Sequence, residues 1–127
     1  MNRIVPMVIA PSAQTRRACF VATVLLSVAL LAFGSQPAMR EFIPPVPWDK
    51  VAHALVFAGF GALVWVMLAS RSVIWPVFVV AIIGFLDESM QFFTPGRVAD
   101  AGDLAADVFG ALIAVLALRS IQIVARR

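Results

Sequence analysis

The sequence predicts an all-α integral membrane protein, a bundle of four transmembrane helices, and two observations support this prediction. First, 62% of the 127 residues are hydrophobic and 13% are charged, whereas a soluble domain is just under half apolar and about a quarter charged. Second, the apolar residues form four runs, each close to the roughly 20 residues that a helix needs to cross a hydrocarbon core. Because backbone groups in lipid must be hydrogen-bonded internally, the runs are expected to be helices rather than strands.

The four predicted spans differ in what lies at their ends. The first follows Arg16 and Arg17, and the third tolerates Pro76 because this residue falls near its start. The fourth has Asp103 and Asp107 in its first two turns. The predicted spans are residues 18–34, 51–69, 72–93 and 101–125.

Proline-containing segments precede and connect the first two spans. Residues 1–15 contain Pro6 and Pro11 and are too short to cross a membrane, so they are predicted to be an N-terminal tail that lies on the membrane surface. Residues 35–50 contain four prolines and are predicted to be an extended loop, with Trp48 in the headgroup region.

The remaining chain, residues 16–127, is predicted to form one membrane domain, since no internal repeat divides it. Its first run is longer than the core of an ordinary signal peptide and three further spans follow, so it is expected to remain as a span. The single cysteine, Cys19, excludes an intramolecular disulfide and is expected to be a small hydrophobic residue facing lipid or a neighbouring helix.

The distribution of charge predicts the orientation. Positively charged residues favour the cytoplasmic side, and a cytoplasmic N-terminus places seven of the ten basic residues inside and all seven carboxylates outside. Both termini are therefore predicted to be cytoplasmic. The basic residues are scattered, without the stripe typical of nucleic-acid binding, so nucleic acid is not an expected partner. The inner set is Arg3, Arg16, Arg17, Arg71, Arg119, Arg126 and Arg127, and the outer set is Arg40, Lys50 and Arg97.

Polar side chains gather where the second span begins, the third ends and the fourth begins. Residues 87–107 alone hold five of the seven carboxylates. Ionisable groups at membrane depth are costly and rarely face lipid, so these side chains are expected to share one recess at the outer face. The candidate site residues are Lys50, His53, Glu88, Gln91, Arg97, Asp103 and Asp107.

Some acidic residues also have a purely structural explanation. Asp100 is expected to be a helix N-cap, and Asp103 could stabilise the first turn in the same way. Asp107 lies beyond that turn and has no such explanation. Asp87 is expected to face water or a neighbouring loop. Arg97 either anchors at the headgroups or grips a lipid phosphate through two hydrogen bonds.

The segments DKVAHALVFAGFGAL and GFLDESMQFFTPGRVADAGDLAADVFGALIA resemble the VanZ-like family. Its pattern combines Lys-x-x-His-x-x-x-Phe/Tyr, Glu-x-x-Gln, a Pro-x-Arg turn and Asp-x-x-x-Asn-x-x-Gly. The chain departs from it at Asp107, where the family usually has Asn. The resemblance implies four membrane helices in a bacterial cell membrane, and the family takes its name from a protein linked to resistance to the glycopeptide teicoplanin. The matching residues are Lys50, His53, Phe57, Glu88, Gln91, Pro95, Gly96, Arg97, Asp103 and Gly110.

Three functions fit this polar set. The first is an enzyme that acts on a lipid-linked or cell-envelope substrate. Glu88 or Asp107 would be its general acid or base, His53 would share the proton transfer, and Lys50 and Arg97 would hold a phosphate or carboxylate.

A divalent cation is an alternative within the same hypothesis, because Glu88, Asp103 and Asp107 offer the oxygen ligands that Mg²⁺ and Ca²⁺ prefer. The second function is a non-catalytic module that binds membrane lipid headgroups, an envelope precursor or a partner protein. The third is a scaffold whose polar residues only join the helices. Gly59 and Gly61 would permit close helix packing, within one chain or between two.

Overall fold

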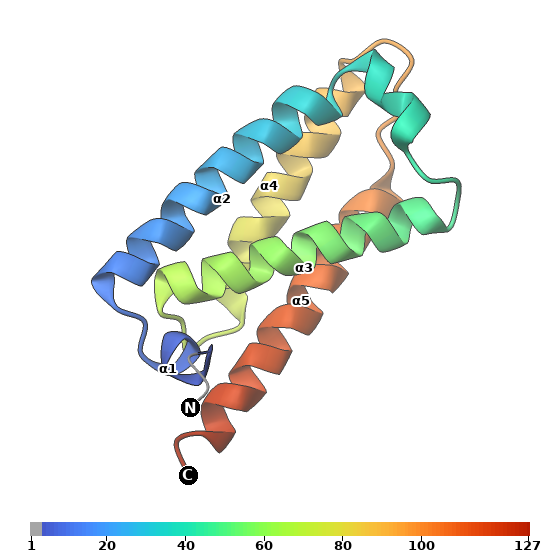
Figure 1. The fold of residues 1–127 in the computed structure, drawn as a ribbon. Helices are drawn as coiled ribbons and strands as arrows, with labels where there is room; N and C mark the ends of the chain where they lie inside the picture. Colours follow the sequence, from blue (N-terminus) through green and yellow to red (C-terminus); the bar gives the residue numbers. More distant parts are fainter. Residues whose placement is uncertain (1–3) are drawn as a thin grey trace.

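The computed structural model describes residues 4–127, with the side chains of residues 7–38 and 41–127. These residues form helices joined by turns and short loops, without a strand, which confirms the predicted fold class (Figure 1). Four helices are long and apolar enough to cross a membrane. They are α2 (Ala13–Gly34), α3 (Trp48–Leu68), α4 (Ile74–Phe92) and α5 (Ala101–Val124).

The described part of the N-terminal segment, residues 4–15, is largely helical. Within it lie helix α1 (Ile4–Ile9) and the first turn of α2, which begins five residues before the predicted span. This early start has a local cause, because the Ser12 hydroxyl accepts a hydrogen bond from the backbone N–H of Thr15 at 3.1 Å and caps the helix. Val8 of α1 is 3% exposed and packs near Trp65 and Val115. Arg3 lies outside the described residues.

The proline-rich loop is also more helical than predicted. Its start forms a 3-10 helix, η1 (Pro37–Phe42), and its end forms the first turn of α3. Proline has no backbone N–H, but the first turn of a helix leaves that group unpaired in any case, so proline is tolerated there. Trp48 is 63% exposed at the start of α3. The side chain of Arg40 lies outside the described part of the chain.

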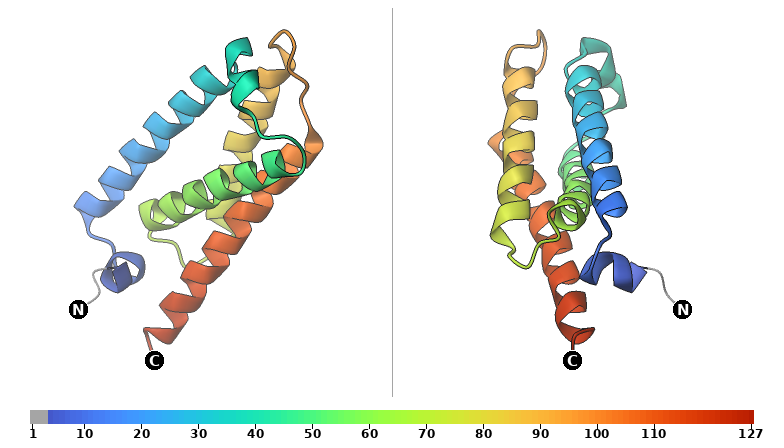
Figure 2. Two further views of the ribbon diagram at one scale, coloured as in Figure 1. Left: turned by 45° about the vertical axis from the view of Figure 1, so that its right-hand side comes forward. Right: turned by 90° about the vertical axis from the view of Figure 1, so that its left-hand side faces the viewer.

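Helices α3 and α5 form the central pair of the bundle, because small residues let their backbones approach closely. A Cβ atom on Gly110 would collide with the backbone of Ala54, and one on Gly61 would lie 3.0 Å from the Cα of Ala111. A Cβ on Gly59, by contrast, would meet nothing within 4 Å. Gly61 therefore packs within the chain. Figure 2 shows α3 and α5 crossing, with α2 and α4 beside them.

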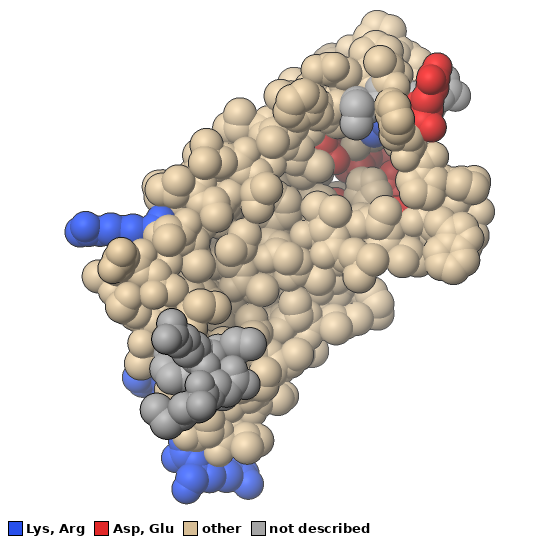
Figure 3. Space-filling view, in the orientation of Figure 1, with Lys and Arg blue, Asp and Glu red and all other residues tan. Residues whose placement is uncertain are grey.

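The ends of the bundle differ in charge. Figure 1 shows both termini at one end, and η1 and the α4–α5 loop at the other. On the face drawn in Figure 3, basic side chains project near the termini, and acidic ones lie at the opposite end. A chain that crosses the membrane four times has both of its ends on one side, and both termini do lie at one end of this bundle. The orientation of this bundle toward the cytoplasm stays a prediction from charge.

Candidate functional site

A pocket of about 830 Å³ lies at the end of the bundle opposite the termini. Figure 3 shows the surface hollowed there, with acidic side chains at the base of the hollow. One part of the wall is apolar and comes from α2, η1 and the segment that follows it, together with α3. Another part is polar and comes from α3, α4, the α4–α5 loop and α5. The apolar lining includes Leu30, Phe42, Ile43, Val46, Val56 and Phe57, and the polar lining includes Asp49, His53, Asp87, Gln91, Arg97, Asp100 and Asp103.

His53 and Asp107 form a pair across the α3–α5 contact. Nδ1 of His53 lies 2.8 Å from Oδ1 of Asp107, whose side chain is fully buried. The pair follows from the helix packing, since Ala54 is adjacent to His53 and Gly110 lies one turn after Asp107. The imidazole also stacks on Phe57, with ring centroids 6.3 Å apart. A carboxylate at Nδ1 fixes the ring, and Nε2 lies 3.7 Å from Oδ2 of Asp103, beyond hydrogen-bonding distance.

Lys50 is paired with neighbouring carboxylates. Its ammonium hydrogen-bonds Asp100 and Asp103 and lies 3.6 Å from Oδ2 of Asp49. Lys50 therefore joins α3 to the start of α5, and its contact with a substrate phosphate stays a prediction. Asp103, predicted to bind substrate or a cation, is held by the same ammonium.

Asp100 is the N-cap of α5, as predicted, because its side chain accepts a hydrogen bond from the backbone N–H of Gly102 at 2.7 Å. The ammonium of Lys50, and then this backbone N–H, hold the pKa of the Asp100 carboxyl below its usual range. Asp100 is thus ionised over the whole physiological pH range.

Glu88 connects α4 to the loop before α5. Its Oε2 accepts a hydrogen bond from the backbone N–H of Asp100 at 2.7 Å, and the residue is 7% exposed. This contact orients Glu88 and closes the polar end of the bundle. Its other oxygen, Oε1, is buried and has no hydrogen-bond partner among the described residues.

Asp87 was expected to face water or a loop, and that expectation is wrong. It is 2% exposed, and its Oδ2 accepts a hydrogen bond from Nε2 of Gln91 at 2.9 Å. The sequence did hold a signal, since Asp87 precedes Gln91 by four residues and the two share one face of α4. That face is buried by a tertiary contact with the end of α2, since a Cβ on Gly34 would lie 3.3 Å from Oδ1 of Asp87.

Arg97 lines the pocket from the α4–α5 loop. It follows Gly96, whose φ of 80° is a conformation that favours glycine. Among the described residues, the Arg97 guanidinium has no ion pair, and its backbone N–H donates to the carbonyl of Thr94 at 3.1 Å. Arg97 is therefore a cation of the pocket wall whose guanidinium is not paired with a described acidic side chain.

The sequence model of the VanZ/LLP1 family matches residues 4–122. The chain belongs to the VanZ/LLP1 family. No curated protein and no solved structure matches it significantly. In this VanZ/LLP1 protein, the residues that suggested the family divide between the pocket and the helix packing. Lys50, His53, Glu88, Gln91, Arg97 and Asp103 lie in or beside the pocket, and Gly110 lies in the α3–α5 contact.

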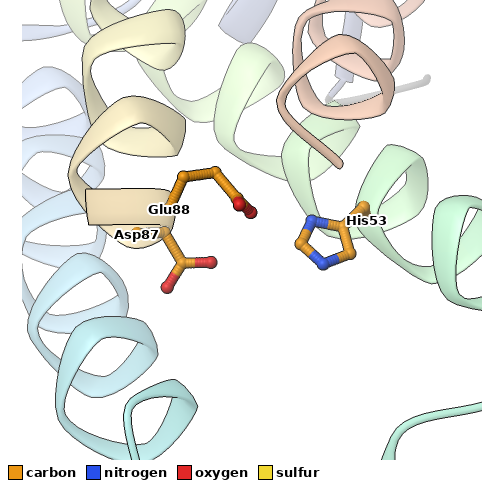
Figure 4. Close-up of side chains that lie close together, drawn as sticks. All are labelled: His53, Asp87 and Glu88. Atoms are coloured by element: carbon orange, nitrogen blue, oxygen red, sulfur yellow. The ribbon is translucent and has the colours of Figure 1, made fainter. Parts of the chain in front are cut away.

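The same end of this VanZ/LLP1 protein contains a group of side chains suited to a metal ion. One ligand atom from each of His53, Asp87 and Glu88 can be chosen so that all three lie within 4.8 Å of one another. Figure 4 shows the two carboxylates extending from α4 and the imidazole facing them from α3. This set differs from the predicted Glu88, Asp103 and Asp107, because Lys50 holds Asp103.

Proposed function

We propose that this VanZ/LLP1 membrane protein binds an amphiphilic molecule of the cell envelope in its pocket. The apolar part of the molecule would lie along α2 and η1, and its headgroup against the polar wall. The observation that supports this is the two-sided lining of a pocket of about 830 Å³, with Leu30, Val46 and Val56 on one side and His53, Gln91 and Arg97 on the other. Pockets of about 300–1,000 Å³ are typical for small molecules.

The position of the pocket suits a lipid-linked ligand. It lies at one end of the spans, where hydrocarbon gives way to headgroups, and Figure 3 views its mouth from the side of the bundle. A mouth on the side would let an alkyl chain remain in the bilayer while the headgroup enters. With the predicted orientation, this entry faces the outer leaflet of a bacterial cell membrane.

The charges of the wall indicate the class of headgroup. Arg97 offers paired N–H donors that match a phosphate or carboxylate. Asp49, Asp87 and Asp103 offer acceptors for hydroxyl or ammonium groups. A headgroup that combines a phosphate with hydroxyl or ammonium donors satisfies both, as envelope phospholipids and lipid-linked precursors do.

Lipid binding by the purified protein tests this function. The protein in detergent would be mixed with phosphatidylglycerol, phosphatidylethanolamine and a chain-matched neutral diacylglycerol, and bound lipid would be counted by native mass spectrometry. We expect the phospholipids to bind, and Arg97→Gln to weaken this binding at least tenfold. Arg71→Gln, which removes the same charge near the opposite end, is the matched control. Equal binding of the neutral lipid, or equal loss in both variants, would contradict the proposal.

A second candidate is catalysis at the headgroup, which the His53–Asp107 pair favours. Asp107 holds Nδ1 at 2.8 Å, so the rest of the imidazole edge can act as a general base on a bound molecule. Chemical change in extracted envelope lipids, present with wild type and lost in His53→Gln, would establish it. Binding without turnover would support the hypothesis of a non-catalytic binding module. Glycopeptide sensitivity of cells that express each variant gives a cellular readout for either function.

A further inference from the structure

We propose that His53, Asp87 and Glu88 bind one divalent transition-metal ion, with Zn²⁺ as the best match, at the base of the pocket. The proposal rests on these side chains and not on the proposed lipid binding. One ligand atom from each lies within 4.8 Å of the other two. Ligands about 2.1 Å from a tetrahedral zinc ion are about 3.4 Å apart, so small side-chain rotations would bring the three atoms into a first coordination shell.

The two carboxylates are each held by one oxygen. Oδ2 of Asp87 accepts from Gln91, and Oε2 of Glu88 accepts from the backbone N–H of Asp100. Oδ1 of Asp87 and Oε1 of Glu88 are buried without a hydrogen-bond partner among the described residues. A buried carboxylate oxygen without a partner is costly. A cation bound between the three side chains would offset the cost of burying these carboxylates, and the two hydrogen bonds would hold the carboxylates in orientation.

The imidazole is held by a third carboxylate. Asp107 contacts Nδ1 of His53 at 2.8 Å. A carboxylate hydrogen-bonded to one nitrogen of a metal-binding histidine is the usual supporting arrangement, because it fixes the ring and strengthens the other nitrogen as a ligand. Asp107 is thus a positioning residue for His53, and Gln91 is one for Asp87.

The surrounding charges favour a cation at this position. Asp103 and Asp107 from α5 also face His53, whereas the nearby ammonium of Lys50 is held by Asp100 and Asp103. Arg97 lines the pocket without an ion pair to Asp87 or Glu88. A divalent ion would therefore offset negative charge that described basic side chains leave uncompensated.

The ligand types point to a transition metal rather than Mg²⁺ or Ca²⁺. Imidazole binds Zn²⁺ and its first-row neighbours well, whereas Mg²⁺ and Ca²⁺ prefer oxygen alone. With the ion bound, the free nitrogen of His53 would be a ligand. Any catalysis at the headgroup would then depend on the metal, with an ion-bound water in place of the imidazole as the base.

The single histidine of the chain makes the test unambiguous. The full chain, purified with a tag free of histidine and cysteine, would be stripped with a chelator and titrated with Zn²⁺. We expect one ion per chain, and zinc X-ray absorption that shows one imidazole with oxygen ligands. That imidazole can only be His53. Substoichiometric zinc, or a bound ion without the imidazole signature, would overturn the site without any substitution.

Substitutions then assign the carboxylates. Asp87→Asn and Glu88→Gln should each raise the Kd for Zn²⁺ at least tenfold, while circular dichroism confirms that the helices remain. Glu41→Gln, which removes an exposed carboxylate of η1 outside the pocket lining, should leave the Kd unchanged. Equal Kd values in all of these proteins would overturn the assignment. Arg97→Gln should bind zinc normally while losing phospholipid, so failure of the metal site and failure of the proposed function are separate results.

Discussion

The two ends of the α3–α5 contact bury opposite kinds of side chain. Toward the termini, Val64, Trp65 and Val115 are completely buried. Toward η1, Asp107 is equally buried and pairs with His53. The end toward the termini is held mainly by apolar packing, although Nε1 of Trp65 is buried there without a partner among the described residues, whereas each buried carboxylate at the other end needs a donor or a cation. One close helix contact thus stabilises the bundle at one end and holds a charged group in place at the other.

The largest effect is expected where this contact is tightest. Gly110→Ala would place a carbon against the backbone carbonyl of Ala54, which cannot rotate away. We expect a loss of about 3 kcal/mol in the free energy of unfolding in detergent, at the upper end for overpacking, together with loss of ligand binding. Gly59→Ala is the control, since its Cβ enters open space. Similar unfolding of the two variants would show that the contact is not tight.

A smaller loss should follow from a cavity at the apolar end. Val64→Ala removes two methyl groups from a fully buried position. In a membrane protein the cost is mainly lost packing, so we expect about 1 kcal/mol. Lipid and zinc binding, measured by mass spectrometry and titration, should not change. Weakened binding would mean that packing at the apolar end controls the geometry of the polar end.

The polar end should respond to salt where the apolar end does not. Lys50→Gln removes the ammonium shared by Asp100 and Asp103, and the Lys50 side chain is 28% exposed. We expect the substitution to lower the free energy of unfolding by about 1 kcal/mol at low salt. This difference should shrink at high salt, because salt screens the ion pairs of Lys50 in the wild type. Chemical unfolding at two salt concentrations measures it, with Val64→Ala as the salt-independent reference.

Asp107→Asn should separate function from stability. It removes a buried charge but keeps a group that can hydrogen-bond His53, so the free energy of unfolding should change by less than about 1 kcal/mol. Zinc affinity should fall about 10–100-fold, as for other groups that support a ligand. Unfolding with loss of helix would instead assign Asp107 a structural role.

The smallest effect is the pH dependence at Asp100. Its pKa is lowered in the folded protein, chiefly by Lys50. The stabilisation is therefore present above the unfolded value of about 3.9 and is lost as pH falls through the lower folded pKa. Wild type should melt slightly higher than Asp100→Asn above about pH 4, and the two should converge in stronger acid. Because Asn also caps helices, the difference in melting temperature between the two proteins reports the contribution of the Asp100 charge alone.

Part of the polar end could be predicted because it depends on helical periodicity. Spacing along each span put His53 one turn after Lys50 and Gln91 one turn after Glu88, and helix-capping preferences identified Asp100. The burial of Asp87 could not be predicted in this way. It depends on how α4 is rotated about its axis, which the packing of α2 and α5 sets.

The partners with which individual side chains pair could also be identified only from the tertiary structure. Spacing along α3 did not show that the Lys50 ammonium pairs with Asp100 and Asp103 at the α5 N-terminus. The metal-binding group likewise joins His53 of α3 to Asp87 and Glu88 of α4, a combination that no local pattern encodes.

The sequence by itself determined the four spans, the family and the gathering of polar residues at the ends of three spans. Hydropathy and helical period are local properties, and lipid forces long apolar runs into helices. Only the tertiary structure decided which residues pair, that Gly61 and Gly110 join α3 to α5, and that Asp87 and Glu88 each have one oxygen without a described partner. These features depend on the rotation and approach of whole helices, which arise from contacts between residues far apart in the chain.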